Sequence, residues 1–360
     1  MTDARGDFRR SAGVLCAVAS LAAAAGNPGC SRAKEAPGQT VTATSASGTG
    51  GATAASGGTG GGGGAGGDAS YAITSLAPAI ALDATPDAGA AYVYFTGVDA
   101  GGRAGVFRVS ARGGASAAEI AVGPPLVAPL GIAASADGGR VFVADPGAGS
   151  SALDDAGALF AIDVPDGALA PVRGGEGLRA RGLEVVRGAD GEEQLVFSGR
   201  DREDGQPGVF ALPARGGEAS AIAKGSPLVD PSGVAVAGGG DVFVCDPLAS
   251  PDGAATIFRI EDGFVSPFAT GLRAGYPCGL ALTRDDAALL VLTRDPARGA
   301  AEVVRIEVAT GARSTVATGA AGDGEPGGLH RAKAADVFAF VDAFVDHGAE
   351  EQGSVFLLSQ

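Results

Sequence analysis

The stretch GVAVAGGGDVFVCDP, residues 233–247, carries the pattern that decides the fold. It opens with a glycine and short apolar residues, passes through a turn rich in Gly and Asp, and continues as the apolar run Val242-Phe243-Val244. Short apolar runs joined by such turns are typical of antiparallel hairpins. Both alternating faces of the run are apolar, which indicates a strand packed between two neighbouring sheets.

This pattern occurs six times, and successive repeats begin 52, 51, 51, 46 and 49 residues apart. A period of roughly 40–50 residues is the size of one four-stranded propeller blade. A β-sandwich would explain the density of strands but not the equal periods. We therefore predict an all-β fold, a six-bladed β-propeller of four-stranded blades. The repeats begin at Ala79-Ile80, Gly131-Ile132, Gly182-Leu183, Gly233-Val234, Gly279-Leu280 and Gly328-Leu329.

The two ends of the repeat region complement each other. The sixth repeat stops at Gln360, directly after its third strand, so its outer strand is missing. Residues 71–77, ahead of the first repeat, resemble the outer strands of the other repeats. We predict that this N-terminal strand completes the last blade, because pairing the chain ends closes the ring.

Residues 1–30 resemble an export signal, with Arg5, Arg9 and Arg10 ahead of an apolar stretch over 12–25. Two processing routes fit. Ala23 and Ala25 suit ordinary signal-peptidase cleavage, whereas Cys30 resembles a bacterial lipid-attachment cysteine. The sequence predicts an exported protein that is secreted or held in the cell envelope, where it is periplasmic, lipid-anchored or exposed at the surface.

Residues 31–68 are dominated by Gly, Ala, Ser and Thr, and predict a disordered tether ahead of a propeller over 69–360. The net charge is −15 and the pI is near 4.5, which disfavours a nucleic-acid partner. We expect a monomer that contacts a membrane only through a lipid at Cys30.

The repeat region contains two cysteines, Cys245 and Cys278. They fall near the same face of neighbouring blades, so an exported chain can join them as a disulfide. The alternative is two buried thiols too far apart to bond.

An aspartate follows each second strand. Six carboxylates on one face can form a rim that attracts cations, with Asp145, Asp246 and Asp295 as candidate metal ligands. The alternative is turn chemistry, in which Asp accepts hydrogen bonds from nearby backbone N–H groups. Recurrence in every blade favours the turn interpretation. The six are Asp99, Asp145, Asp201, Asp246, Asp295 and Asp342.

A more specific pair of candidate functional residues lies at the third position of the first strands. Four repeats have alanine there, and two have Glu184 and His330. These two belong to blades that face each other across a six-fold ring, and first strands line the central channel. The pair is therefore a candidate for acid/base catalysis or for binding an ion. Alternatively, each points between blades and is satisfied locally, with Arg181, Arg187 or Arg331 available as a partner. The four alanines are Ala81, Ala133, Ala235 and Ala281. The second histidine, His347, is expected in solvent.

With Gly-aliphatic-Ala starts, Asp-Gly turns and Val-Phe-Val-x-Asp runs, residues 71–360 resemble the NHL-like and gluconolactonase-like propellers of the senescence marker protein type, here in an exported bacterial lipoprotein form. The resemblance implies a divalent cation such as Ca²⁺ held in the channel by Glu, Asn and Asp. Only Glu184 and the loop aspartates match, because the single asparagine, Asn27, lies in the export signal.

Two functions are consistent with these observations. The first is a non-catalytic binding module that presents the ring to an unidentified protein or small ligand. The second is a divergent metal-dependent hydrolase of the lactonase kind, or a lyase, using Glu184 and His330. The sequence contains no Gly-x-Ser-x-Gly, His-Glu-x-x-His, Cys-x-x-Cys or Walker motif, which favours the first function.

Overall fold

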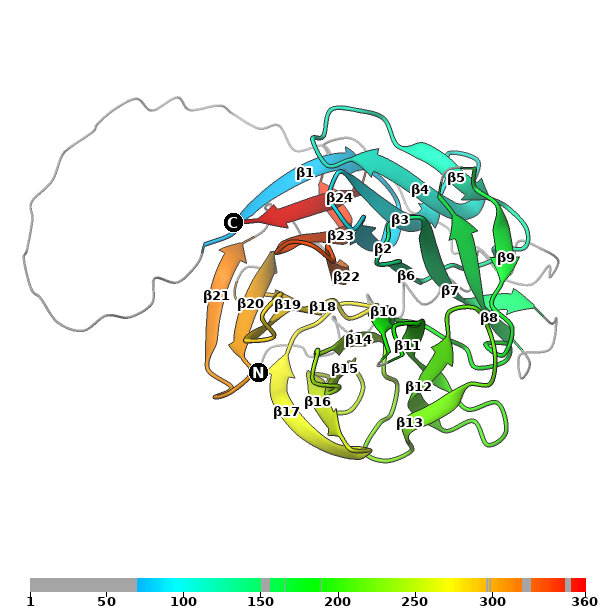
Figure 1. The fold of residues 1–360 in the computed structure, drawn as a ribbon. Coiled ribbons are helices and arrows are strands. Elements are labelled where there is room, and N and C mark those ends of the chain that lie inside the picture. The colour runs from blue at the N-terminus through cyan, green and yellow to red at the C-terminus, as the bar shows by residue number, and fades with distance from the viewer. Residues whose placement is uncertain are drawn as a thin grey trace, which may run out of the picture.

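Six four-stranded antiparallel sheets form a closed ring in the computed structural model (Figure 1), which confirms the predicted six-bladed propeller. The structure describes residues 70–149, 156–164, 166–188, 190–295, 297, 299–318, 325–346 and 351–360. The predicted export signal, Cys30, the tether and His347 lie outside these residues. Within them, no helix is long and apolar enough to cross a membrane.

Each blade runs from an innermost strand at the channel to an outermost strand at the rim. Blade 1 contains β2 (Ala81–Pro86), β3 (Tyr92–Val98), β4 (Ala104–Ser110) and β5 (Ala118–Val122). Blade 2 contains β6 (Gly131–Ala134), β7 (Arg140–Gly149), β8 (Ala156–Asp163) and β9 (Leu169–Pro171). Blade 3 contains β10 (Leu183–Arg187), β11 (Glu193–Arg200), β12 (Pro207–Pro213) and β13 (Ser220–Lys224).

The remaining blades follow the same order. Blade 4 contains β14 (Gly233–Val236), β15 (Val242–Asp246), β16 (Ala255–Glu261) and β17 (Phe264–Leu272). Blade 5 contains β18 (Leu280–Leu282), β19 (Ala288–Arg294), β20 (Ala301–Glu307) and β21 (Arg313–Thr318). Blade 6 contains β22 (Pro326–Arg331), β23 (Val337–Asp346), β24 (Glu351–Ser359) and β1 (Ala72–Pro78).

The predicted ring closure is confirmed. β1, in blue, lies beside β24, in red, so the first strand of the chain completes the last blade (Figure 1). The two strands pair antiparallel, with Ile73 opposite Leu358 and Ser75 opposite Phe356. The N–H of Tyr71, just before β1, also donates to Val316 O at 3.1 Å. This hydrogen bond ties the start of β1 to the neighbouring blade 5.

The hydrophobic core is divided among the blade interfaces. Among the described residues there are six apolar clusters, each combining side chains of two consecutive blades. On β7, Phe142 packs toward blade 3 while Val141 and Val143 pack toward blade 1. The second strands are apolar on both faces because each face meets a different neighbour.

Glycine at the blade starts is required by close backbone approach around the channel. A Cβ added to Gly131 would lie 1.9 Å from Arg181 O of the next blade. At Gly328 it would lie 1.7 Å from Oδ1 of Asp83. Any larger residue at these positions would push the innermost strands apart. Gly328 therefore makes room for a carboxylate in the channel.

The first blade begins differently from the prediction. A bulge between Ala81 and Asp83 shifts the register of β2, so that Thr85 faces Tyr94 as Ala133 faces Phe142 in blade 2. The prediction that Ala81 is equivalent to Ala133 is therefore wrong, since Thr85 has that place. Asp83 faces Thr96 at the place that Gly131 has in blade 2.

Candidate functional site

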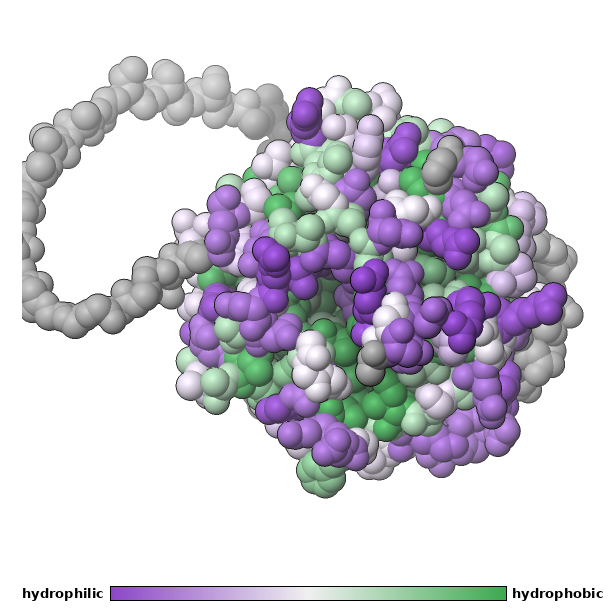
Figure 2. All heavy atoms as spheres, viewed as in Figure 1, coloured by the Kyte–Doolittle hydropathy of each residue, from purple (hydrophilic) through white to green (hydrophobic). Residues whose placement is uncertain are grey.

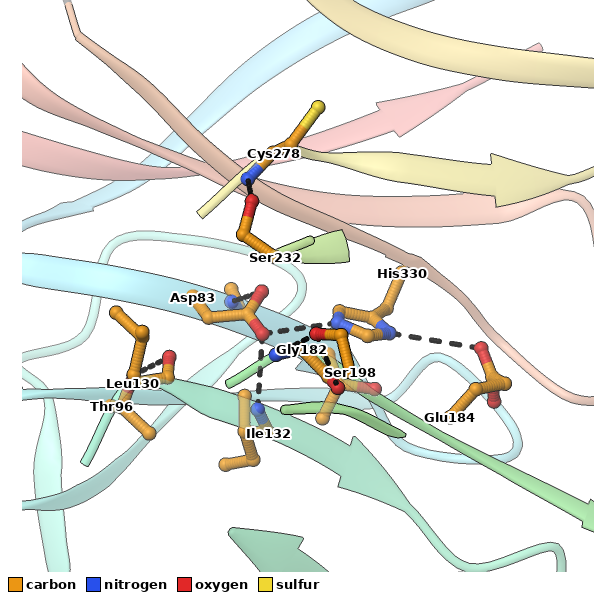
Figure 3. Close-up of polar contacts among 12 residues, drawn as sticks. Asp83, Thr96, Leu130, Ile132, Gly182, Glu184, Ser198, Ser232, Cys278 and His330 are labelled. Carbon is orange, nitrogen blue, oxygen red and sulfur yellow. Dashed lines mark hydrogen bonds and ion pairs between the residues drawn. The ribbon is translucent and has the colours of Figure 1, made fainter. Parts of the chain in front are cut away.

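Four charged side chains meet in the channel: Asp83, Glu184, His330 and Lys333. We call them the channel cluster. His330 lies between two carboxylates (Figure 3), with Nε2 3.0 Å from Oδ2 of Asp83 and Nδ1 3.7 Å from Oε2 of Glu184. The structure thus brings Glu184 and His330 together from blades 3 and 6, as the six-fold arrangement predicts.

Each carboxylate of the cluster also accepts hydrogen bonds from backbone N–H groups. Oδ1 of Asp83 accepts from the N–H of Ala84 at 2.8 Å, and Oδ2 accepts from Ile132 N of blade 2 at 3.0 Å. Oε1 of Glu184 accepts from Val185 N at 2.9 Å and from Nζ of Lys333. The two acids and two bases therefore form a charge-neutral chain across the channel.

Burial and pairing set the protonation states. Burial alone would raise the pKa of Glu184, but the nearby charges of Lys333 and His330 lower it to about 2. Burial alone would lower the pKa of His330, but the charge and hydrogen bond of Asp83, followed by the charge of Glu184, raise it to about 10. At neutral pH Glu184 is a carboxylate and His330 an imidazolium.

Sequence reasoning missed Asp83 and Lys333. Asp83 precedes Val93 by ten residues, as Gly131 precedes Val141, so aligning blade 1 on its second strand would have placed Asp83 at the channel. No such signal exists for Lys333, which follows β22. Its Nζ reaches across to Glu184 and to Val185 O at 2.9 Å.

Among the described residues, none of the three arginines considered as local partners pairs with Glu184 or His330. Nη1 of Arg181 lies 2.5 Å from Oδ1 of Asp230 on the loop before blade 4. Arg331 donates to backbone carbonyls, and Arg187 has an exposed side chain at the end of β10. The alternative in which one of these arginines is the partner is therefore wrong, because Lys333 pairs with Glu184 and Asp83 pairs with His330.

The loop aspartates divide into two kinds. Asp145, Asp246 and Asp342 are buried at equivalent ends of the second strands. Oδ2 of Asp246 accepts from Val229 N and Asp230 N at 2.7 and 3.0 Å, and Oδ1 accepts from Leu248 N at 3.0 Å. Asp145 likewise fastens residues 127–128 and its own turn. These side chains hold loops together, as the turn interpretation expects.

The other three aspartates lie in turns nearer the solvent. Asp99 accepts from Gly101 N and Arg103 N, and Asp295 accepts from Ala297 N. Asp201 pairs with Nζ of Lys224 at 2.6 Å, which lowers the pKa of its carboxyl. The structure does not bring the six carboxylates together at one point.

The residues present do not fit the divalent cation that the family resemblance implies. Within the described residues, no group of three or more His, Cys, Asp or Glu side chains is arranged to hold a metal ion. Glu184 is occupied by Lys333 and His330, and Asp145 and Asp246 are occupied by backbone N–H groups. A cation at Glu184 would have to displace two positive charges.

Cys245 and Cys278 are joined as a disulfide, with Cα atoms 6.0 Å apart. Cys245 is the last residue but one of β15, and Cys278 lies just before β18. The bond therefore ties blade 4 to blade 5 close to the channel. The backbone N–H of Cys278 also donates to Oγ of Ser232 at 3.1 Å (Figure 3).

A cavity of about 490 Å³ opens where the first strands of blades 3 to 6 turn into their second strands. We call it the mouth cavity. Its lining includes Glu184 and Lys333 of the channel cluster, so the cluster forms part of its floor. The size lies in the range of small-molecule sites. Figure 2 shows one face of the ring, on which hydrophilic side chains border a hollow near the middle.

On the other side of His330 the channel is almost filled. The space lined by Asp83, His330 and Ser232 is about 10 Å³, enough for about one water molecule. The channel cluster thus separates the mouth cavity from the opposite face of the ring.

No protein-family model matches the sequence, and no curated protein matches it. Among solved structures, a gluconolactonase from Xanthomonas campestris is 17% identical, covers 79% of this chain and 88% of its own, and has a TM-score of 0.55. The PQQ-bound aldose sugar dehydrogenase from Streptomyces coelicolor is 14% identical, covers 81% and 99%, and has a TM-score of 0.55. These likenesses show the fold. At such identities they carry no activity over to this chain.

Proposed function

We propose that the chain is an exported, tethered β-propeller that binds a small ligand in the mouth cavity, and that Glu184 and His330 stabilise the floor of that cavity without catalysing a reaction. The observation that carries this proposal is the position of His330. Both of its ring nitrogens face carboxylates, at 3.0 and 3.7 Å. An imidazolium held in this way has no lone pair with which to accept a proton.

The pKa values support the same conclusion. A general base works best when its pKa is near the operating pH. Pairing moves the pKa of His330 to about 10 and that of Glu184 to about 2, both far from neutrality. A hydrolase would need one of these groups to exchange protons at neutral pH, whereas a binding site only needs them to hold their charges.

Blocking the mouth cavity tests the binding function. Gly239 lies in a turn of the cavity wall, and Gly89 lies in the matching turn of blade 1, away from the cavity; a Cβ at either would meet nothing within 4 Å. We expect Gly239→Trp to abolish saturation-transfer NMR signals from a fragment set of small acids, amines and amides, while Gly89→Trp keeps them. Binding that survives Gly239→Trp would contradict the proposal.

A hydrolysis assay tests the alternative. We expect no turnover of δ-gluconolactone or other lactones above the uncatalysed rate, with or without Ca²⁺, and no rise in melting temperature on adding Ca²⁺ or Zn²⁺. Metal-dependent turnover that disappears in Glu184→Gln would establish the hydrolase and refute the binding-only function.

The export part of the proposal rests on residues 1–30 and the tether over 31–68. We propose that the mature chain is a monomer in the cell envelope, anchored through Cys30 or released after cleavage near Ala25. Metabolic labelling with a clickable palmitate, followed by cell fractionation, distinguishes the two. Cys30→Ser should abolish labelling if the chain is anchored, and a chain retained in the cytoplasm would refute export.

A further inference from the structure

The mouth cavity carries more positive than negative side chains, although the whole chain has a net charge of −15. Both of its carboxylates are already engaged. Glu184 binds Lys333, and Oδ2 of Asp286 accepts from Gly238 N at 2.7 Å. An acidic protein that gathers cations around one cavity concentrates anions there. The four cations are Arg187, Arg284, Arg331 and Lys333.

Arg331 is the best placed of these cations. Its Nε donates to Leu282 O at 2.8 Å and its Nη1 donates to Ala332 O at 2.9 Å. These two carbonyls fix the half-buried guanidinium between blades 5 and 6. Within the described part of the chain, no carboxylate pairs with Arg331 and Nη2 makes no hydrogen bond. A guanidinium oriented in this way retains donors for a carboxylate ligand.

The walls beside Arg331 are apolar. Val185, Val236, Ala281 and Leu282 line the cavity from the innermost strands of blades 3, 4 and 5. Val236 is half-buried and the other three are almost fully buried, so a ligand that places an anionic group at Arg331 would meet Val236 and the exposed edges of the others. Inorganic anions would use the charge but gain nothing from the apolar walls.

We propose that the mouth cavity binds a small organic carboxylate, with its carboxylate group on Arg331 and its apolar body against Val185, Val236 and Leu282. This inference rests on the proposed binding function, since it names the ligand class of the same cavity. Lys333 contributes charge at the floor, but its ammonium is already bound to Glu184 and Val185 O.

Calorimetric titration of the full chain with matched ligand pairs tests the proposal. Hexanoate and benzoate are the acids, and hexanamide and benzamide are their neutral counterparts of nearly equal shape. We expect each acid to bind at least about tenfold more tightly than its amide, because charge-assisted hydrogen bonds exceed neutral ones by about 1.4 kcal/mol or more. Raising the salt concentration should weaken the acids alone.

Four variants assign the effect to Arg331. Arg331→Gln should weaken benzoate at least tenfold, and Arg331→Lys should recover part of that loss. Arg215→Gln is the matched control: its side chain is 69% exposed on blade 3 and does not line the cavity, so affinity should stay unchanged. Because Arg331 joins two blades, melting temperatures must accompany each titration. Arg284→Gln, in the exposed turn between β18 and β19, should weaken benzoate less than Arg331→Gln without lowering stability.

The outcomes separate this inference from the function beneath it. Equal binding of acids and amides that is lost in Gly239→Trp would refute the carboxylate class and leave the binding function intact. Phosphate binding as tightly as benzoate would refute the need for an apolar body. Failure of acids, amides and phosphate alike would overturn the carboxylate inference, and failure of the whole fragment set would overturn the binding function as well.

Discussion

Two seams close the ring between its first and last strands, and they are built from different interactions. At the rim, the outer seam pairs β1 with β24 through backbone hydrogen bonds and buries Leu76 and Ala77. At the channel, the inner seam pairs His330 of β22 with Asp83 of β2 across 3.0 Å. The outer seam repeats what every blade does, whereas the inner seam replaces small apolar residues with buried charges.

The comparison shows that this fold uses buried charges at one place where the other blades use apolar packing. Ala133, Ala235 and Ala281 occupy the third position of their first strands in three blades and cost nothing to bury. Charges at such positions lose several kcal/mol of hydration, which pairing only offsets. The outer seam therefore supplies stability, and the inner seam supplies fixed charges at the floor of the mouth cavity.

The largest effect is expected from breaking the outer seam. Deleting residues 70–78 would expose the edge of β24 and the buried side chains of blade 5 and blade 1 that β1 covers. We expect a loss of more than about 5 kcal/mol in the free energy of unfolding, since several buried apolar side chains at about 1.5–3 kcal/mol each go with the strand. Circular dichroism melting measures it.

Deleting residues 31–68 is the control for that experiment, because every strand that the structure describes lies after residue 71. It should leave the melting temperature unchanged. An unaltered melting curve after the deletion of β1 would show that the ring closes without it.

Breaking the inner seam is expected to cost somewhat less. His330→Leu removes the cation between Asp83 and Glu184, and leaves Asp83, which is 1% exposed, without its partner. Removing one member of a buried ion pair costs about 3–5 kcal/mol, measurable by urea unfolding. The double variant Asp83→Leu with His330→Leu should recover part of this loss. A single variant as stable as the wild type would mean that the pair contributes no coupling.

The sequence predicts the outer seam and the opposition of Glu184 and His330. The outer seam follows from a count of strands: the sixth repeat lacks one and residues 71–77 supply it. The opposition of Glu184 and His330 follows from six-fold symmetry once the repeats are aligned. Both predictions use only the period of the chain and the geometry of a closed ring.

The rest of the channel cluster was not predictable in that way. The bulge before Asp83 breaks the register of blade 1, so alignment on Ala79-Ile80 hid the acid. Lys333 lies beyond its strand, and the direction of its long side chain depends on the surrounding turns. Periodicity locates backbone positions, but flexible side chains and single-residue bulges are decided by tertiary contacts.

The disulfide between blades 4 and 5 gives a stability contribution with which both seams can be compared. The disulfide joins blades 4 and 5 across a sequence separation of 33 residues. Replacing Cys245 and Cys278 by alanine should cost about 4 kcal/mol, as expected for a loop of this length. Urea unfolding of this variant and of His330→Leu shows whether the disulfide or the His330–Asp83 pair contributes more to the free energy of unfolding. No loss of stability on removing the disulfide would show that the inner packing alone holds this junction.

The pH dependence of stability isolates the inner seam. The pKa of Glu184 falls from 4.5 to about 2 on folding, so its stabilisation is complete above about pH 4.5 and is lost as pH falls toward 2. The pKa of His330 rises from 6.5 to about 10, so its stabilisation is complete below about pH 6.5 and is lost as pH rises toward 10.

We therefore expect the contribution of the inner seam to be greatest between about pH 4.5 and 6.5, and to fall by roughly 1–3 kcal/mol on approaching pH 9. Urea unfolding at several pH values measures the change, and the double variant with leucine at positions 83 and 330 is the control. If the difference between wild type and double variant does not change with pH, the predicted protonation states are wrong.

The most direct test of the central claim is the protonation state of His330, followed by NMR of the imidazole nitrogens as a function of pH. The chain has two histidines, so His347→Gln leaves the signals of His330 alone. The account predicts a doubly protonated ring throughout the neutral range, with a pKa near 10. A ring that loses its proton near pH 6.5 in the folded protein would contradict the ion pair and make His330 available as a catalytic base.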